Sequence, residues 1–161
     1  GDWAENRIVP DCIKSWIKNK PVIIKSPNST RPFQHVLEPL SGYISLAEKL
    51  NTEKHLSGES FNFGPPSNFD YKVIDVVKKL ALNWDNSSWV IDKNEKKYIE
   101  SKLLKLNCDK ALALLQWQPN LDFEKTMELT FDWYYNYYYD KNINIFNKCC
   151  SQIRNLISNK N

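Results

Sequence analysis

The chain has 161 residues, of which 42% are hydrophobic, and its 22 basic and 19 acidic residues give a formal net charge of +3. A net charge this small does not support nucleic-acid binding. No apolar stretch reaches the roughly 18–20 residues of a membrane span, and no signal peptide opens the chain. We therefore expect a cytoplasmic protein of one domain, with no nucleic-acid and no membrane partner.

The spacing of the cysteines also suits a cytoplasmic protein. Cys12, Cys108, Cys149 and Cys150 form no C-x-x-C pair, and no histidine stands at the spacing of a metal site. We expect reduced cysteines and no bound metal.

Helices and short strands alternate in the first half of the chain. It begins at Gly1 with a segment typical of the middle of a domain, so we expect a piece of a longer protein. Apolar residues recur at helical spacing over 7–19, from near Glu38 to Leu50, and over 73–80. Short β-branched or alternating runs predict strands over 22–25, over 60–64 and within 87–92.

The second half predicts a further strand, a short helix from Asp109 and a turn at Pro119. Asp122 is a suitable N-cap for a long helix, because its carboxylate can accept hydrogen bonds from the backbone N–H groups of the first turn. The alternation of helices and strands predicts an α/β or α+β arrangement. We expect residues 1–140 to form the folded part, and the Asn- and Lys-rich residues 141–161 to form a loosely held tail.

Few residues suggest catalysis. The sequence contains no G-x-S-x-G, no G-x-G-x-x-G and no Walker motif. His35 lies in an apolar run, where a hydrogen-bonded structural histidine is a better interpretation than a ligand contact. The aromatic run over 133–139 would suit base stacking, but no basic stripe lies beside it, so we favour packing in the core. We assign no catalytic residue to this chain.

Arg31 is the clearest candidate for a ligand contact. It stands between a turn and the apolar run that begins at Phe33. A guanidinium in such a place pairs with an anion, because its planar fork matches carboxylate or phosphate. The anion is either a carboxylate of the chain, such as Glu38, or a bound ligand, and these residues alone leave the two interpretations equal.

Four stretches together resemble a known family. They are GDWAENRIVPDCI at 1–13, TRPFQHVLEPLSGYISLAEKL at 30–50, FNFGP at 61–65, and 104–134 with LKLNCDKALALLQWQP and TFDWY. They resemble the C-terminal part of the extended short-chain dehydrogenase/reductases that act on nucleotide sugars, and among these the branch of the CDP-glucose 4,6-dehydratases. The resemblance covers nearly the whole chain.

The resemblance implies an α/β fold in which this chain supplies the substrate-binding C-terminal portion, without the N-terminal Rossmann part. Enzymes of the family oxidise the sugar at C4 with bound NAD, eliminate water across C5–C6 and return the hydride to C6. Their NAD loop, catalytic threonine and Tyr-x-x-x-Lys pair belong to the N-terminal part. We therefore expect this chain to lack them and to be inactive alone, CDP-glucose to be the substrate, and the whole enzyme to be a homo-oligomer.

The resemblance also implies binding roles for particular residues. Arg31 matches the arginine that binds the pyrophosphate, which favours the ligand contact over a pair with Glu38. Asn62 matches a pocket asparagine, and Glu100 matches an acid that meets a ribose hydroxyl. The residues that match those around the base, the ribose and the phosphates are Arg7, Ile8, Pro10, Ile24 and Lys97.

The chain departs from the family pattern at three places. Ile99 stands where a histidine is usual, Lys97 or Lys96 where an arginine is usual, and Gln116 in place of the glycine of an L-G-W motif. Two alternatives to the CDP-glucose branch stay open. In the first, the chain belongs to another sugar-nucleotide dehydratase or epimerase. In the second, it is a non-catalytic α/β module that kept the binding pocket.

Overall fold

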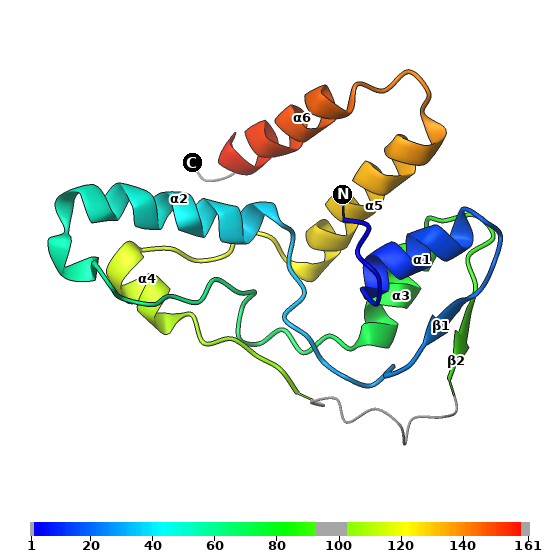
Figure 1. Cartoon of the computed structure of the whole chain (residues 1–161), viewed down its shortest axis with the longest axis horizontal. Helices are drawn as coiled ribbons and strands as arrows, with labels where there is room; N and C mark the ends of the chain where they lie inside the picture. Colours follow the sequence, from blue (N-terminus) through cyan, green and yellow to red (C-terminus); the bar gives the residue numbers. More distant parts are fainter. Residues whose placement is uncertain (1, 93–102, 159–161) are drawn as a thin grey trace.

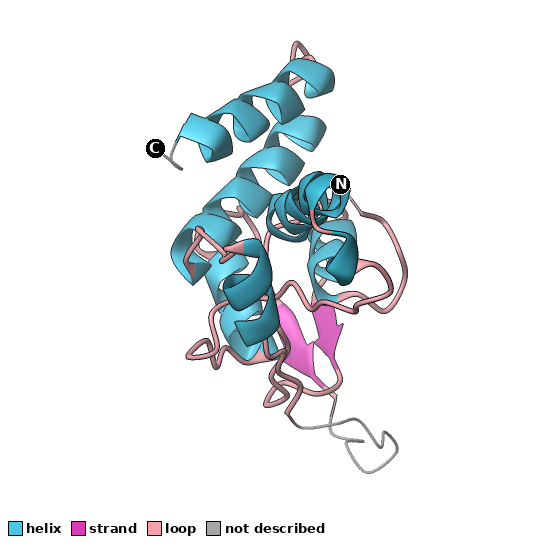
Figure 2. Cartoon of the chain, turned by 90° about the vertical axis from the view of Figure 1, so that its left-hand side faces the viewer, coloured by secondary structure: helices cyan, strands magenta, loops and turns pink. Residues whose placement is uncertain are grey.

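Two short parallel strands form the sheet of this chain. The computed structural model describes residues 2–92 and 103–158. Within them β1 (Val22–Ile24) pairs with β2 (Trp89–Ile91), and Val22 lies opposite Trp89. Both strands were predicted from their β-branched and aromatic residues. Figure 2 shows how small this sheet is beside the helices that surround it.

Three helices build the main core beside the strands. α1 (Ile8–Trp16) packs on β1 and on α3 (Val73–Ala81), and α3 packs on α5 (Phe123–Tyr139). Asp122 caps α5 as predicted, because its Oδ1 accepts the Lys125 N–H at 2.7 Å. The buried residues of this main core come from α1, β1, α3 and α5, and from Trp84 just after α3: Cys12, Ile13, Trp16, Val22, Ile24, Val76, Val77, Leu80, Trp84, Phe123, Met127, Trp133 and Tyr134.

A second, thinner layer extends away from the strands (Figure 1). It consists of α2 (Leu37–Thr52), a short 3-10 helix η1 (Lys54–Leu56) and α4 (Asp109–Leu115), and we call it the α2–α4 layer. Its own core is small and contains Leu56, Phe63, Ala111, Leu115 and Trp117.

The buried carboxylate of Glu38 ties the α2–α4 layer to the start of α5. Its Oε1 accepts the backbone N–H of Leu121 at 2.9 Å, and both oxygens accept that of Asn120 at 3.1–3.2 Å. Glu38 is almost fully buried, so these charge-assisted bonds are not weakened by water.

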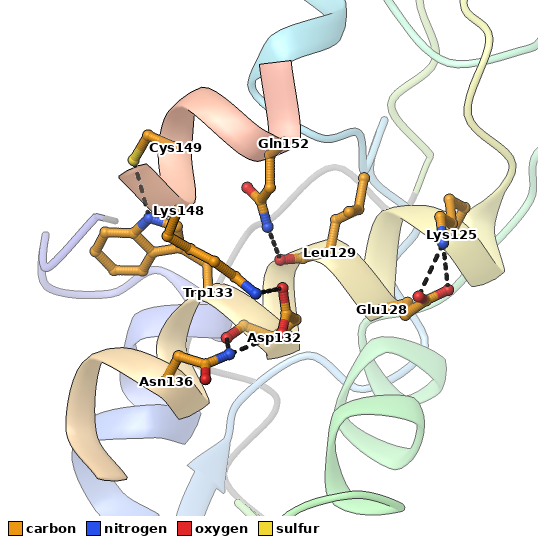
Figure 3. A network of polar contacts seen from close by, with 9 residues as sticks. All are labelled: Lys125, Glu128, Leu129, Asp132, Trp133, Asn136, Lys148, Cys149 and Gln152. Atoms are coloured by element: carbon orange, nitrogen blue, oxygen red, sulfur yellow. Dashed lines mark hydrogen bonds and ion pairs between the residues drawn. The ribbon is translucent and has the colours of Figure 1, made fainter. Parts of the chain in front are cut away.

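The segment expected to be a loose tail contains a docked helix. α6 (Ile145–Ser158) lies along α5, and Figure 3 shows their polar contacts. Lys148 Nζ pairs with Asp132 Oδ2 at 2.5 Å, and Gln152 Nε2 donates to the Leu129 carbonyl at 2.9 Å. The helix was missed because its polar residues hide a sparse apolar row, in which Ile145, Cys149 and Leu156 recur at helical spacing.

Two predicted strands are absent from the described residues. Residues 60–64 and 103–107 adopt no regular structure, although they lie side by side. Asn62 Nδ2 donates to the Asn107 carbonyl at 3.2 Å, and the Gly64 N–H donates to Cys108 Sγ at 3.1 Å. A strand needs a ladder of backbone hydrogen bonds, and the described residues supply no ladder partner for either segment.

No described helix is both long and apolar enough to cross a membrane.

Candidate functional site

The carboxyl ends of β1 and β2 gather three of the residues predicted to bind the base and ribose. In open α/β sheets ligands bind beyond the carboxyl ends of parallel strands. Ile24 ends β1, and the next residue, Lys25, donates from Nζ to Asn6 Oδ1 at 3.1 Å. This bond links the end of β1 to the residue before Arg7, and α1, which begins at Ile8, packs on β1. Arg7 is exposed and Ile24 is buried.

Arg31 lies farther along the loop that leaves β1. An antiparallel bridge between Thr30 and Lys72 fixes this loop, and Arg31 Nη1 donates to the Thr30 carbonyl at 2.7 Å. Arg31 is half-buried and borders a small surface hollow, which we call the Arg31 hollow. The other residues around it are Thr30, Pro32, Pro65, Pro66, Ser67, Phe69, Leu104, Lys105 and Leu106.

The structure does not bring all the predicted residues together. Asn62 is exposed and contacts the Asn107 carbonyl, and it does not border the Arg31 hollow, although Pro65 does. Its binding role therefore stays a prediction. Lys97 and Glu100 lie outside the described residues.

Pro10 faces a separate apolar cleft of about 370 Å³. The cleft lies between the start of α1, the segment 33–37, α5 and α6, and its walls include Phe33, Met127, Trp133 and Tyr134. No sequence pattern predicts this cleft, because one of its walls forms only where α6 docks. Trp133 and Tyr134 themselves are buried, so this part of the aromatic run packs in the core as predicted.

His35 lies in the wall of this cleft as a buried, neutral side chain. Burial lowers the pKa of its imidazole from 6.5 to about 4. Its Nδ1 accepts the backbone N–H of Leu37 at 3.4 Å, at the first turn of α2. This geometry agrees with the interpretation of His35 as a structural histidine. Among the described residues no group of three or more His, Cys, Asp or Glu side chains gathers as metal ligands would.

The spacing of the catalytic tyrosine and lysine does occur in the sequence, although the catalytic pair itself is expected to lie outside this chain. The pattern Tyr-x-x-x-Lys occurs twice, at Tyr98 to Lys102 and at Tyr137 to Lys141. The first occurrence lies outside the described residues. In the second, α5 ends at Tyr139, so Lys141 does not share a helical face with Tyr137, whose ring stacks on Trp133 at 5.4 Å. A working pair of this kind needs both side chains on one helical face.

Comparison with known proteins identifies a relative of known activity. The chain is 43% identical over 136 residues to a CDP-glucose 4,6-dehydratase of Salmonella typhimurium. The match covers 83% of this chain and 37% of that protein, so the chain spans little more than a third of its relative's length. No model of a protein family matches the chain.

Solved structures show the same fold. A UDP-glucuronic acid 4-epimerase from Bacillus cereus, in complex with UDP-glucuronic acid and NAD, matches with a TM-score of 0.64 and 20% identity, over 83% of this chain and 41% of that one. A dTDP-glucose 4,6-dehydratase from Bacillus anthracis, in complex with NAD, matches with a TM-score of 0.58 and 18% identity, over 81% and 39%. The resemblance inferred from the sequence is confirmed: over 83% of its length this chain is related to part of a CDP-glucose 4,6-dehydratase, and it shares the fold of part of the nucleotide-sugar epimerases and dehydratases of solved structure.

Proposed function

We propose that this chain is the nucleotide-sugar-binding part of an enzyme that converts CDP-glucose to CDP-4-keto-6-deoxyglucose. The observation that carries the proposal is the 43% identity to a CDP-glucose 4,6-dehydratase. The position of Arg31 at the edge of a hollow, on the loop that leaves β1, supports it.

NAD, the cofactor of the proposed reaction, has no site that these residues could form. A dinucleotide diphosphate is held by a glycine-rich turn between a strand and a helix. The four glycines of the chain stand at positions 1, 42, 58 and 64, too far apart for such a turn. The residues present do not fit NAD, so the proposal places its site, and the chemistry at C4, C5 and C6, outside this chain.

The proposed role of Arg31 is to hold the diphosphate of the substrate. Its guanidinium presents parallel N–H groups that match two phosphate oxygens. Because Arg31 is half-buried, its attraction for an anion is screened by water less than that of an exposed arginine.

Titration calorimetry with CDP on the full-length protein tests the proposal. We expect Arg31→Ala to weaken CDP binding by about 2–5 kcal/mol, the usual loss when one partner of a desolvated charge pair is removed. Arg31→Lys should restore only part of this loss, because lysine keeps the charge without the fork. Arg154→Ala, at the exposed Arg154 of α6, is the matched control and should bind CDP as the unmodified protein does.

The alternative, a structural pair between Arg31 and Glu38, gives the opposite result. Removing Arg31 would then lower the melting temperature and leave the CDP affinity of the folded protein unchanged. Unchanged CDP affinity in a well-folded Arg31→Ala protein contradicts the proposal. Parallel titrations with UDP and dTDP separate a CDP enzyme from another sugar-nucleotide dehydratase or epimerase.

A further inference from the structure

A second cation borders the Arg31 hollow. Lys105 borders it from the segment that begins at residue 103, far from Arg31 in sequence. The hollow is small, with a volume of about 10 Å³, so it has room for about one water molecule. An anion larger than water would therefore lie across its mouth, within reach of both side chains, and not inside it.

Lys105 is held beside the hollow by a weak ion pair. Its Nζ lies 3.5 Å from Asp70 Oδ1, and the two side chains are 41% and 65% exposed. An exposed pair of this kind contributes little to stability, so lysine can exchange the carboxylate for another anion at small cost. The bridge between Thr30 and Lys72 fixes the backbone next to Asp70 and so keeps this carboxylate near the hollow.

The charges around the hollow favour an anion. Arg31 and Lys105 both border it, and none of the described residues around it is a carboxylate. Asp70, which pairs with Lys105, lies outside the lining, and Asp75 accepts the backbone N–H of Lys72. Two cations at one hollow attract a multiply charged anion more strongly than a single arginine does.

We propose that Lys105 is a second diphosphate contact beside Arg31, and that Asp70 competes with the ligand for it. This inference rests on the proposed function and names a specificity-determining pair for it. Arg31 takes one phosphate with its fork, and Lys105 takes the other as a point charge. Lys105 therefore distinguishes a nucleoside diphosphate from a monophosphate, which presents no second phosphate.

Calorimetric titration of the full-length protein with CDP and with CMP tests the pair. Lys105→Ala should weaken CDP binding about tenfold, the value of one charged hydrogen bond, and CMP binding by much less. Asp70→Asn should strengthen CDP binding about two- to fivefold, because the competing carboxylate is gone. Two variants with opposite effects on one ligand exclude a general loss of folding, which a melting curve for each checks directly.

Lys110 supplies the matched control. Its side chain is also 41% exposed and also pairs with a carboxylate, Glu59, at 2.5 Å. It does not border the hollow, so Lys110→Ala and Glu59→Gln should leave CDP affinity unchanged.

The outcomes separate this inference from the function on which it rests. If Arg31→Ala loses CDP binding while Lys105→Ala and Asp70→Asn do not change it, the second contact is wrong and the proposed function stands. If Lys105→Ala weakens CMP and CDP equally, the assignment to the second phosphate is wrong. If neither Arg31→Ala nor Lys105→Ala changes CDP affinity, both proposals fail.

Discussion

The two layers of the molecule differ in how completely they bury their apolar residues. The main core around β1, β2, α1, α3 and α5 has thirteen buried side chains among the described residues. The α2–α4 layer has five. On α2 the outward side chains of Leu40, Tyr43 and Ile44 are 44%, 57% and 62% exposed.

This difference shows that the α2–α4 layer covers its apolar surface less completely than the main core does. An amphipathic helix of a complete domain buries one apolar stripe. On α2, Gly42 and Tyr43 pack against Phe63, yet Tyr43 and its neighbours Leu40 and Ile44 remain largely exposed. We therefore expect the main core to carry most of the stability of this chain.

The first prediction compares one tryptophan from each layer. Trp16 is 1% exposed and Trp117 is 3% exposed, and each indole N–H has an acceptor, the Ser88 carbonyl at 2.8 Å and Ser41 Oγ at 2.9 Å. Trp16→Ala should lower the free energy of unfolding by about 3–5 kcal/mol. Trp117→Ala should cost less, because its thin surroundings can collapse into the space. Urea unfolding measures both, and an equal or larger cost at Trp117 would show that the layers are equally well packed.

Acid should weaken the junction between the layers through His35. Its pKa is about 4 in the folded chain and 6.5 when unfolded, so the unfolded chain takes up the proton first. The free energy of unfolding should therefore fall by about 3 kcal/mol as the pH drops from about 6.5 to about 4. His35→Gln should remove this part of the pH dependence.

The same substitution at the exposed His55 offers the control. His55→Gln, at a side chain that is 67% exposed, shows what the change from histidine to glutamine does away from the junction. Carboxylates also titrate in this range, so the comparison between the two variants isolates His35. If His35→Gln and His55→Gln give the same dependence of stability on pH, the burial of His35 does not control the junction.

Much of the helical structure could be predicted from the sequence. The apolar spacing over 73–80 predicts α3, and the N-cap Asp122 predicts the start of α5, because both signals are local. The same spacing predicts α2 as well, but it does not show that Leu40 and Ile44 would be exposed. Periodicity shows that a helix has an apolar face, and only tertiary structure shows whether a partner covers it.

The candidate site was predictable only in part, for the same reason. The resemblance singled out Arg31, and the structure places it at a hollow. Lys105 has no sequence signal of its own, because it meets Arg31 only when the segments 103–107 and 30–33 pack together. The strand expected over 60–64 failed because alternation predicts a strand only where another strand can pair with it.

A smaller effect is expected at Gly42, where α2 meets the core of its layer. A Cβ at this position would overlap the ring of Phe63, which also packs edge-to-face on Trp117 with 4.9 Å between ring centroids. Gly42→Ala should therefore cost about 1–3 kcal/mol, the usual range for overpacking, although alanine is the better helix former. A variant at least as stable as the unmodified protein in thermal unfolding would show that the ring can move freely in this layer.

The smallest effect is expected at Gln116, which ends α4. Its φ of 54° and ψ of 28° lie in the left-handed region, and the Trp117 N–H closes the helix end on the Ala111 carbonyl at 3.2 Å. Glycine suits this conformation because it has no Cβ, which agrees with the glycine of the L-G-W motif at this place. Gln116 is exposed, so its replacement loses no packing.

Gln116→Gly should therefore stabilise the chain by about 0.5–1 kcal/mol. The substitution relieves the strain of the left-handed conformation, and part of that gain is offset because glycine has more conformational freedom in the unfolded state. Gln116→Ala keeps a Cβ and should give no gain. Asn19, in the turn that follows α1 and with φ of 52°, is the comparison position beside the main core. Asparagine tolerates this conformation, so Asn19→Gly should gain less than Gln116→Gly. Chemical denaturation measures the free energy of unfolding of the three variants. An equal gain from Gln116→Gly and Asn19→Gly would mean that Gln116 is no more strained than Asn19.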